Sequence, residues 1–445
     1  MDQTIFKAYD IRGIYPDQIN EDLAYKLGRA FVVFTQAKKV MVARDMRLSS
    51  ESLNQSLIKG ILDQGADIID IGLSASPVFL FANAKYKQDA GIYITASHNP
   101  KEYNGFKLVR DKNSVMPITQ DTGLLDIADI MRKNEFKAVI KKGGISYKTI
   151  IDEFIESIFK YVTPQEISNL RIVVDTGNGM AGMVFPKIFD KLSCQVTPLY
   201  WEIDGSFPNH QSNPLLAETT IDLKKRLIAE KADLGIATDG DADRIIFIDE
   251  KGQMIQPDLI TALIAKELLI QNPRQKILYD TRSSRIVKET IEANGGQPVL
   301  CKSGYSFIKL KMDKEQILFG GERSGHYFLK DLCYRDVPFI TALFILKILT
   351  REKKPISEII QPFKKYLSIE ETNFEVKNKD EIIKKVEKYY TQGKINHLDG
   401  ITVEFKDWWF NLRPSNTESL LRLNLEANAD KLMKEKFKEI KDLIK

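Results

Sequence analysis

Short apolar runs of strand length alternate with amphipathic helical segments along most of the chain. Residues 40–43, 67–70 and 91–95 have the composition of buried strands, and residues 51–64 have helical periodicity. Strands that alternate with helices in this way are typical of βαβ units, in which helices cover a parallel sheet. The first part of the chain is therefore predicted to be an α/β domain.

The same layout restarts twice. The second set comprises predicted strands at residues 171–175, 234–238 and 245–248 and a helix at 221–232. The third set comprises predicted strands at residues 276–280, 298–301 and 316–319 and a helix at 284–294. The repetition predicts the α/β class, with three related α/β domains at residues 1–150, 151–253 and 254–365.

The C-terminal stretch does not continue this alternation of strands and helices. It has strand-like segments at residues 374–376, 400–405 and 420–425, a helix at 381–390 and a lysine-rich terminal helix. This mixed pattern predicts a smaller C-terminal α+β domain at residues 366–445.

The composition is that of a packed globular protein and excludes several classes of function. Of the 445 residues, 43% are hydrophobic, and 65 Lys and Arg against 61 Asp and Glu give a net charge of +4. Because the lysines are spread along the chain, no nucleic-acid partner is expected. The longest apolar stretch, at residues 339–349, contains Lys347 and is shorter than the roughly 20 residues that span a bilayer, so no membrane partner is expected.

The cysteines and the first residues of the chain indicate the cellular compartment in which the protein resides. Cys194, Cys301 and Cys333 are far apart and odd in number, so they suggest neither a disulfide framework nor a thiolate metal site. Met1 is followed by two polar residues, and no signal peptide is expected. We therefore predict a cytoplasmic protein.

Three aspartates alternate with small residues in Thr238-Asp-Gly-Asp-Ala-Asp-Arg244. Carboxylates that converge on one point repel each other unless a cation lies between them, and a ligand set of oxygen alone favours a hard ion. No His or Cys is nearby in the sequence, which argues against zinc. Asp239, Asp241 and Asp243 are therefore predicted to bind Mg²⁺, with a solvated acidic turn as the alternative.

A calcium-binding EF-hand is a second alternative for this segment. The three aspartates and Glu250 fall on its ligand positions 1, 3, 5 and 12. However, Arg244 stands where that loop needs glycine, and residues 245–248 are a strand-like run rather than a ligand loop. The EF-hand interpretation is therefore rejected.

Ser97 and His98 lie in Ile94-Thr-Ala-Ser-His-Asn-Pro100, just after a predicted strand. A hydrolase nucleophile is one interpretation, but the G-x-S-x-G elbow is missing, and adjacent side chains rarely have nucleophile–base geometry. A serine that faces a magnesium site suits phosphoryl transfer better, because its oxygen can complete the metal shell. A turn or helix-cap serine is the structural alternative.

Two further loops carry polar groups suited to a sugar phosphate. In Phe319-Gly-Gly-Glu-Arg-Ser-Gly-His326 the glycines bring the backbone close to a ligand, and Glu322 and Ser324 can reach adjacent sugar hydroxyls. Asn411-Leu-Arg-Pro-Ser-Asn-Thr-Glu418, predicted to lie between two strands, combines groups that can hold phosphate. A tight loop and a polar hairpin turn are the structural alternatives.

Six motifs resemble those of the α-D-phosphohexomutases, occur in the same order and span nearly the whole chain. They are Lys7-Ala-Tyr-Asp-Ile-Arg-Gly13, residues 95–100, Tyr103-Asn-Gly-Phe-Lys107, residues 239–244, residues 320–326 and residues 413–418. The first, third and last of these are similar to the phosphomannomutase/phosphoglucomutase branch of the superfamily.

The resemblance implies four domains around a central cleft, each contributing one motif. It implies that Ser97 is carried as phosphoserine, that Ser97 and the three aspartates hold Mg²⁺, and that Arg244 pairs with the phosphoserine or the carboxylates. The other implied residues bind the sugar (Glu322, Ser324 and His326) or phosphate (Tyr9, Arg12, Arg413, Ser415, Asn416 and Thr417).

The implied reaction is reversible transfer of a phosphoryl group between C1 and C6 of a hexose phosphate, mannose or glucose. It passes through a hexose 1,6-bisphosphate, which also serves as activator. Lys107 and His98 are the nearest candidates for proton transfer, and Lys107, which would need a lowered pKa, is preferred by a small margin.

Four further residues near the implied sugar site are candidates with less support. They are Arg282, Lys302, Tyr305 and Arg323. Tyr305 replaces a histidine that is common in bacterial relatives, and Arg282 replaces a lysine. Both side chains titrate far above neutral pH, so they leave the second acid or base unassigned. Arg323 adds a cation beside the sugar and leaves the choice between mannose and glucose open.

Other functions remain as alternatives to this mutase. Phosphoglucosamine mutase is the nearest in substrate, and a non-catalytic paralogue that binds sugar phosphate belongs to another class. The serine, the three aspartates and both loops are all intact, which favours the enzyme over the paralogue. Monomers and homodimers are both compatible with the implied architecture.

Overall fold

The computed structural model describes residues 2–111, 114–136, 139–415 and 420–444. The chain forms two compact units, one of Met1–Ile255 and Ser324–Ser357 and the other of Gln256–Arg323 and Glu358–Lys445. Within the described ranges, no helix combines the length and apolar character needed to cross a membrane.

The first sheet of the first unit has the strand order β1-β5-β4-β2-β3-β7, with β6 paired to β5. Its strands are β1 (Ile11–Ile14), β2 (Lys39–Arg44), β3 (Asp67–Leu73), β4 (Ala90–Ile94), β5 (Tyr103–Arg110), β6 (Met116–Pro117) and β7 (Ile145–Tyr147). Strands β2, β3 and β4 are parallel, whereas β5 runs antiparallel to β4 and β1. The α/β prediction for this region is confirmed.

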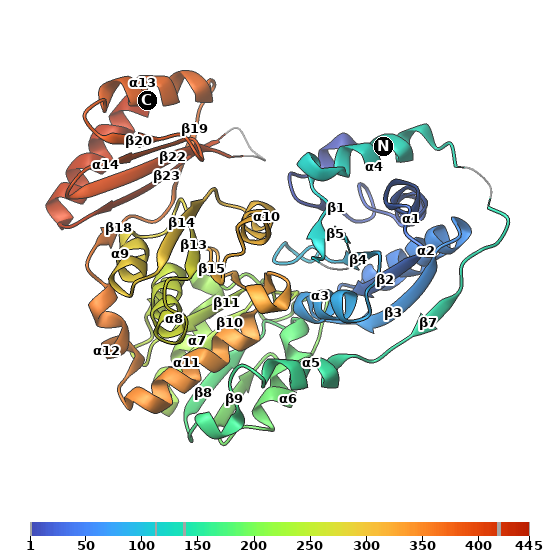
Figure 1. Ribbon diagram of the computed structural model, residues 1–445, viewed down its shortest axis with the longest axis horizontal. Helices are drawn as coiled ribbons and strands as arrows, with labels where there is room; N and C mark the ends of the chain where they lie inside the picture. The colour runs from blue at the N-terminus through green and yellow to red at the C-terminus, as the bar shows by residue number, and fades with distance from the viewer. Residues whose placement is uncertain (1, 112–113, 137–138, 416–419, 445) are drawn as a thin grey trace. The chain divides into compact units, whose positions relative to one another are not determined.

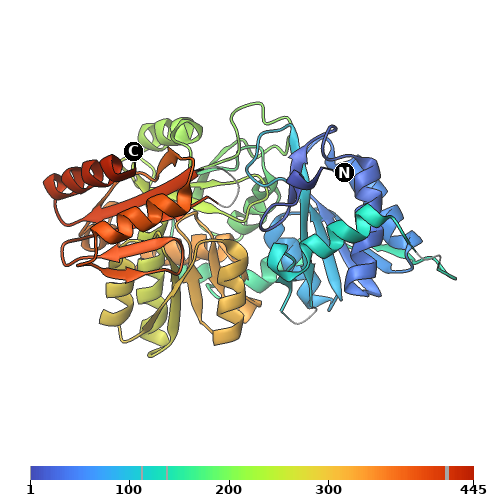
Figure 2. The same ribbon diagram turned by 90° about the horizontal axis from the view of Figure 1, so that it is seen from above.

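Helices cover both faces of this sheet. They are α1 (Glu21–Thr35), α2 (Ser50–Asp63) and α4 (Leu124–Lys133) on one face and α3 (Ser76–Lys85) on the other. Helices α1 and α2 lie side by side (Figures 1 and 2). Helix α1 begins where the Asn20 side chain accepts a hydrogen bond from the amide of Leu23. On the opposite face, the ring of Phe79 stacks on Tyr93 of β4 at 5.4 Å.

The second sheet of the first unit has the strand order β12-β11-β10-β8-β9. Its strands are β8 (Arg171–Asp175), β9 (Gln195–Leu199), β10 (Leu234–Thr238), β11 (Ile245–Ile248) and β12 (Met254–Ile255). The helices of this region are α5 (Ile151–Ile158), α6 (Phe185–Phe189), α7 (Ile221–Glu230) and α11 (Pro338–Glu352), and α12 (Ile356–Ile360) follows. The long apolar stretch lies in α11, where Phe339 packs edge-on against Phe154 and Phe185. This stretch is therefore core.

In the second unit, β14-β13-β15 form a parallel sheet. The elements are β13 (Lys276–Asp280), β14 (Gln297–Cys301), β15 (Phe319–Gly321), α8 (Pro257–Gln271), α9 (Arg285–Ala293) and α10 (Tyr305–Glu315). The strand predicted at residues 316–319 is wrong in its position. Gln316 ends α10 in the left-handed conformation, with φ of 55°, so the strand begins only at Phe319.

The three α/β regions repeat one strand arrangement. Each contains three parallel strands, β2, β3 and β4, or β8, β9 and β10, or β13, β14 and β15, and the first of the three in sequence lies between the other two. The third strands are β4, β10 and β15, and they lead directly into the segments that carry Ser97, Asp239 and Glu322. Ligand sites of open α/β sheets lie at the carboxyl ends of strands. The repeat therefore places each predicted functional segment at such an end.

The C-terminal domain is an antiparallel sheet with the order β18-β23-β22-β21-β20, and β19 also pairs with β23. Its strands are β18 (Leu367–Ser368), β19 (Thr372–Glu375), β20 (Lys394–Asn396), β21 (Ile401–Glu404), β22 (Trp408–Pro414) and β23 (Leu420–Ala427). Helices α13 (Lys379–Tyr389) and α14 (Asp430–Ile444) pack on its apolar face (Figure 1). The predicted α+β domain is confirmed. However, Asn411 and Arg413, predicted to lie between the strands at residues 400–405 and 420–425, belong to a further strand, β22, because Asn411 pairs with Thr402 and Asn424.

Replacing Gly105 by alanine is expected to destabilise the first sheet. Gly105 pairs with Arg12 across β5 and β1. A Cβ at this position would lie 2.0 Å from the backbone oxygen of Ile11. The oxygen belongs to the neighbouring strand, so the two strands must separate, and overpacking of this kind costs about 1–3 kcal/mol. Thermal unfolding should show a lower midpoint than that of the wild type.

Gly144→Ala is the matched control. A Cβ on Gly144 has Asp67 Oδ1 as its nearest neighbour at 3.6 Å, which is an ordinary contact. Its midpoint should stay within the error of the wild type. Equal midpoints for the two alanine variants would contradict the close approach of β1 and β5.

Candidate active site

Ser97 and Asp239 meet in the first unit although 142 positions separate them in the chain. Ser97 follows β4 in the left-handed region, with φ of 50°, and its amide donates to Thr95 Oγ1 at 2.8 Å. The Ser97 hydroxyl donates to Asp239 Oδ2 at 3.0 Å and lies 3.2 Å from His98 Nδ1. The predicted nucleophile thus faces the predicted metal-binding segment.

The three aspartates form one buried cluster. Ligand oxygens of Asp239, Asp241 and Asp243 lie within 4.8 Å of one another. The backbone amides of Asp243 and Arg244 each donate to Asp239 Oδ1 at 3.1 Å, which curls the segment around that carboxylate. A Cβ on Gly240 would lie 2.6 Å from the backbone oxygen of Ser97, so only glycine allows this approach.

Lys107 supplies the positive charge nearest to this cluster. Its ammonium donates to Asp241 Oδ2 at 2.5 Å and to Asp243 Oδ2 at 2.6 Å. Burial alone would lower the pKa of Lys107, but the two carboxylates outweigh burial and raise it. Burial, together with Asp243 and Asp241, raises the pKa of Asp239 well above its usual range. Without a metal ion, Lys107 is therefore charged and neutralises only part of the cluster.

The cluster fits a divalent cation. Asp241 Oδ1 and Asp243 Oδ1 are buried and have no hydrogen-bond partner among the described residues. Buried carboxylate oxygens without partners are costly, and oxygen ligands suit a hard ion such as Mg²⁺. The three aspartates, with the oxygen of Ser97 beside them, are the residues that would hold it. An ion at this point would share Asp241 and Asp243 with Lys107.

Replacing Lys107 by methionine is expected to tighten Mg²⁺ binding about tenfold or more. Positive charges roughly 5 Å apart repel by about 3 kcal/mol per unit charge at an effective dielectric constant of 20, and each 1.4 kcal/mol is tenfold in affinity. Because the lysine can swing aside, we expect only part of this gain. Calorimetric titration with Mg²⁺ at constant ionic strength measures the effect.

Lys26→Met provides the control, since Lys26 pairs with Asp22 on the surface of α1. Its Mg²⁺ affinity should equal that of the wild type. Weaker binding by the Lys107→Met protein would contradict competition between the ammonium and the ion.

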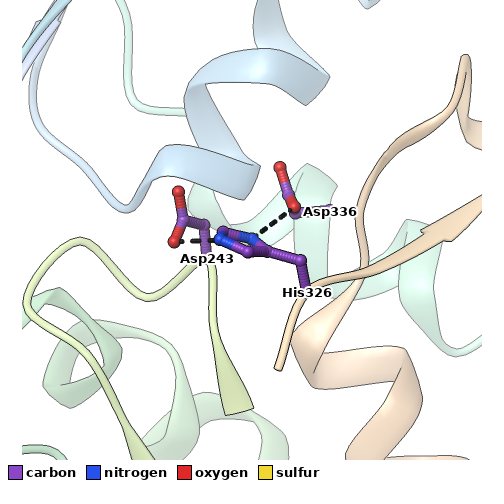
Figure 3. Close-up of side chains that lie close together, drawn as sticks. All are labelled: Asp243, His326 and Asp336. Atoms are coloured by element: carbon purple, nitrogen blue, oxygen red, sulfur yellow. Dashed lines mark hydrogen bonds and ion pairs between the residues drawn. The ribbon is translucent and has the colours of Figure 1, made fainter. Parts of the chain in front are cut away.

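Arg244, His326 and Asp336 form a hydrogen-bonded chain beside the cluster. His326 Nδ1 lies 2.9 Å from Asp336 Oδ1 and 3.8 Å from Asp243 Oδ1 (Figure 3). Arg244 Nε donates to His326 Nε2 at 3.1 Å. The two residues His326 and Asp336 meet because β16 (Tyr327–Leu329) and β17 (Arg335–Asp336) form an antiparallel pair.

The hydrogen bond from Arg244 identifies the proton on His326. An arginine always donates, so Nε2 has a lone pair and the ring proton is on Nδ1. Burial lowers the pKa of His326, but Asp243 and Asp336 raise it to about 9, which favours a second proton. A doubly protonated ring has no acceptor for Arg244, so the hydrogen bond from Arg244 requires the singly protonated ring. Protonation of His326 and its contact with Arg244 therefore exclude each other.

His98 and Lys107 differ in their ability to accept a proton. Burial, Arg244 and Arg12 hold the pKa of His98 well below its usual range, so its imidazole is neutral. The pKa of Lys107 is shifted upward, away from the value that a proton acceptor needs. These directions favour His98 over Lys107, the reverse of the order expected from the sequence.

Arg12 and Tyr9 of the opening motif lie at the start of β1. Arg12 Nη1 donates to Asn99 Oδ1 at 2.7 Å, and its guanidinium also pairs with Asp10. Tyr9 precedes the strand by two positions. The β1–β5 pairing therefore brings Arg12 to the segment that carries Ser97.

In the second unit, Glu322 is held by Arg282. Arg282 Nη2 donates to Glu322 Oε1 at 2.9 Å, and the amide of Gly304 donates to the same oxygen at 3.0 Å. Burial lowers the pKa of Arg282, but Asp280 and Glu322 outweigh it and raise the pKa. Arg323 Nη1 donates to the backbone oxygen of Arg282 at 2.9 Å. The predicted sugar-binding carboxylate thus lies among cations.

The other predicted sugar-site residues are placed as follows. Lys302 Nζ lies 3.4 Å from the centre of the Phe307 ring. Tyr305 is the first residue of α10. Ser324, in the first unit, has a buried hydroxyl that lacks a hydrogen-bond partner among the described residues. Such a hydroxyl is available to a ligand.

In the C-terminal domain, Arg413 projects from β22 and donates from Nη2 to Glu371 Oε2 at 3.0 Å. Its Nε is buried and has no hydrogen-bond partner among the described residues. The amide of Ser415 donates to the backbone oxygen of Leu420 at 2.8 Å. Asn416 and Thr417, also predicted to bind phosphate, lie outside the described residues.

Sequence reasoning missed three side chains around Ser97 and His326. They are Arg47, Gln211 and Asp336, each of which contacts one of these segments. No motif in the sequence around Asp336 indicated that this residue would lie at the site. Arg47 lies in Asp45-Met-Arg47, which resembles Asp280-Thr-Arg282 at the equivalent strand end of the third region, so the internal repeat could have revealed it.

Comparison with known proteins identifies the family. Profiles described as phosphoglucomutase/phosphomannomutase match the whole chain domain by domain. Alpha/beta/alpha domains I, II and III match residues 3–138, 151–252 and 256–366, and the C-terminal domain matches residues 371–443.

Similar proteins match this chain over nearly their whole length. A phosphomannomutase of Escherichia coli is 38% identical, over 96% of this chain and 95% of its own length. A phosphomannomutase of Vibrio cholerae is 39% identical, over 99% of this chain and 98% of its own. The crystal structure of a phosphoglucomutase/phosphomannomutase family protein from Burkholderia thailandensis matches with a TM-score of 0.90 and 32% identity, over 100% of this chain and 97% of that one.

These matches confirm the resemblance drawn from the six motifs and the four-domain architecture. The chain therefore belongs to the phosphoglucomutase/phosphomannomutase family of phosphohexomutases and is an enzyme, an isomerase that moves a phosphoryl group within a sugar phosphate.

Proposed function

We propose that this enzyme is a Mg²⁺-dependent mutase that moves a phosphoryl group between C1 and C6 of mannose or glucose phosphate. Ser97 carries the phosphoryl group, and a hexose 1,6-bisphosphate is the intermediate. The observation that carries the proposal is the 3.0 Å contact of Ser97 Oγ with Asp239 Oδ2, inside a buried aspartate cluster with unpartnered oxygens. Cytoplasmic location remains a prediction.

The transfer exchanges one P–O bond for another. The sugar hydroxyl attacks the phosphorus on Ser97, the bond from phosphorus to Ser97 Oγ breaks, the hydroxyl proton passes to a neighbouring base, and the departing Ser97 Oγ takes up a proton. His98 is the group proposed to give a proton to Ser97 Oγ when this oxygen leaves, and to take it back when the Ser97 hydroxyl attacks in the return step, because its Nδ1 lies 3.2 Å from Ser97 Oγ and its ring is neutral. Mg²⁺, when bound, supplies the positive charge that stabilises negative charge on the transferred group.

Fixed cations of the chain support the same step. Arg244 Nε lies 3.8 Å from Asp239 Oδ2 and is oriented by His326, so its charge is held near the reacting oxygens without reorganisation. Lys107 gives up its contacts with the aspartates when an ion binds, and its ammonium is then available to the phosphoryl group.

The second half of the reaction returns the other phosphate to Ser97. For this the bisphosphate must turn end over end, so the residues that hold its sugar and its distal phosphate must accept both orientations. Glu322, Ser324 and His326 are proposed to hold the hydroxyls. Arg413, Ser415, Asn416, Thr417, Tyr9 and Arg12 are proposed to hold phosphate.

Intact-mass spectrometry and coupled assays test the proposal. The purified protein should carry one phosphoryl group, and a peptide containing Ser97 should hold it. Mannose 1-phosphate, glucose 1-phosphate and glucosamine 1-phosphate are then compared by kcat/KM. Turnover of either of the first two supports the proposal. A preference for glucosamine phosphate, or phosphate-free protein without turnover, would overturn it.

A further inference from the structure

We infer that Arg47 is a positioning residue that holds the Ser97 loop, residues 97–103 from after β4 to the first residue of β5, in its reactive conformation. The inference rests on the proposed function, because it takes Ser97 as the carrier of the phosphoryl group. Arg47 comes just after β2 and is 2% exposed. It belongs to none of the predicted catalytic, metal, sugar or phosphate sites.

The Arg47 guanidinium binds four backbone oxygens of this loop. Nη1 donates to the oxygens of Pro100 at 2.7 Å and Tyr103 at 2.8 Å. Nη2 donates to those of Ser97 at 2.8 Å and Asn99 at 2.7 Å. The planar fork of a guanidinium can satisfy several acceptors at fixed angles, which an ammonium cannot do. One buried side chain therefore fixes the course of the whole loop.

A second segment, which contains Phe207 and Gln211, contacts the same loop and Arg47. Gln211 Nε2 donates to the backbone oxygen of His98 at 2.9 Å. The Phe207 ring lies over the guanidinium of Arg47, with its centre 5.2 Å from Cζ. Consequently, each backbone oxygen of residues 97–100 accepts a hydrogen bond from a side chain outside the loop.

The loop needs this support because of the conformation of Ser97. Residues other than glycine rarely adopt a φ of 50°, and such strained positions persist only where surrounding contacts over-determine them. The strained residue is also the one whose hydroxyl must reach Asp239. Relaxation of Ser97 toward negative φ would turn its Oγ away from the aspartate cluster.

Asp45 holds the backbone amide and the Nε atom of Arg47. Asp45 Oδ1 accepts hydrogen bonds from the amide of Arg47 at 3.0 Å and from the hydroxyl of Ser50 at 2.6 Å. Asp45 Oδ2 lies 3.2 Å from Arg47 Nε. Both ends of the arginine are thus held, so its guanidinium has one orientation.

The third α/β region has a similar arrangement of an aspartate, an arginine and the segment that the arginine contacts. There Asp280 Oδ1 accepts from the amide of Arg282 at 3.2 Å, and Arg282 Nη2 reaches Glu322, the residue after the third strand. In both regions an Asp-x-Arg sequence at the end of the middle parallel strand, β2 or β13, braces the segment that follows β4 or β15. The second region has Thr176 and Gly177 after Asp175 instead and lacks this arginine. The repetition indicates a positioning role rather than an incidental core contact.

Arg47→Lys tests the inference, because it keeps the charge beside Asp45 but not the fork. Displacements of about 1 Å cost roughly 10²-fold in rate, so kcat should fall by about this factor while KM changes less than about threefold. Arg29→Lys is the matched control. Arg29 also binds a side-chain oxygen, Gln64 Oε1 at 3.1 Å, and packs on a ring, Phe136 at 4.3 Å, but on the helices α1 and α2.

Two readouts separate positioning from a general loss of stability. Rapid-quench mass spectrometry measures how fast the phosphorylated protein passes its phosphoryl group to substrate in one turnover, and this rate should fall only in Arg47→Lys. Guanidinium ion below denaturing concentrations should restore part of the rate to Arg47→Ala and none to Arg29→Ala. If Arg47→Ala does not fold, Gln211→Met replaces it and should show a smaller loss of the same rate.

The outcomes distinguish this inference from the proposed function. Wild-type protein that is phosphorylated on Ser97, together with a wild-type transfer rate in Arg47→Lys, would overturn the positioning role alone. A loss equal to that of Arg29→Lys at equal thermal stability would do the same. Wild-type protein without phosphoserine and with full activity after Ser97→Ala would instead remove the proposed function itself.

Discussion

The Ser97→Ala protein is expected to carry no phosphoryl group and to lose roughly 10⁴-fold or more in kcat/KM. The serine oxygen is the atom that takes and returns the phosphoryl group, and a methyl group has no oxygen for this. The fold should persist, because the loop is held through its backbone oxygens, which the substitution leaves intact. Intact-mass spectrometry and a coupled assay measure both effects.

Ser146→Ala is the control for this experiment. Ser146 is an exposed serine in β7 whose hydroxyl donates to the backbone oxygen of Ile68 at 3.2 Å. This variant should keep both the phosphate and the turnover of the wild type. An active Ser97→Ala enzyme would show that another residue carries the phosphoryl group.

The Asp239→Asn protein is expected to be inactive and yet more stable than the wild type when no divalent metal is present. Asp239 is fully buried, and burial together with Asp243 and Asp241 makes its charge unfavourable. An asparagine removes this charge, and its oxygen can still accept from the amides of Asp243 and Arg244. The same change removes a proposed Mg²⁺ ligand, so kcat should fall by roughly 10³-fold.

Thermal unfolding in chelator and in Mg²⁺ separates the two effects. The variant should unfold at a higher temperature than the wild type in chelator and should gain less from added Mg²⁺, because an ion that binds only the folded state stabilises it. Asp129→Asn is the control, since Asp129 is an exposed residue of α4, and it should change neither quantity. A destabilised Asp239→Asn protein in chelator would contradict repulsion within the cluster.

Hydropathy patterns sufficed for the elements whose burial is regular. The strands predicted at residues 171–175 and 234–238 coincide with β8 and β10, because four consecutive residues of β8 and all five of β10 are buried on both faces of the sheet. The strand predicted at residues 316–319 was misplaced, because Gln316 caps a helix, and this depends on where α10 begins. Strand β1 was not predicted as a strand, since it is short and adds to the sheet only through β5.

The predicted proton acceptor illustrates a property that has no sequence signal. Lys107 was predicted to accept the proton because it ends one of the six motifs. In the structure its ammonium donates to Asp241 and Asp243. The direction of its pKa shift follows from those two carboxylates, which belong to another domain of the chain. The neutral state of His98 likewise follows from its burial and from Arg244 and Arg12.

The amino-acid sequence alone determined the alternation of strands and helices, the repeated α/β layout and the chemistry of each short motif, because these depend on residues close together in the chain. Only the tertiary structure decided which motifs meet. Ser97 reaches Asp239, and Asp336 reaches His326, because strand order and hairpin pairing bring separate strand ends together. Burial and neighbouring charge then set the state of each side chain, and both arise only after the chain has folded.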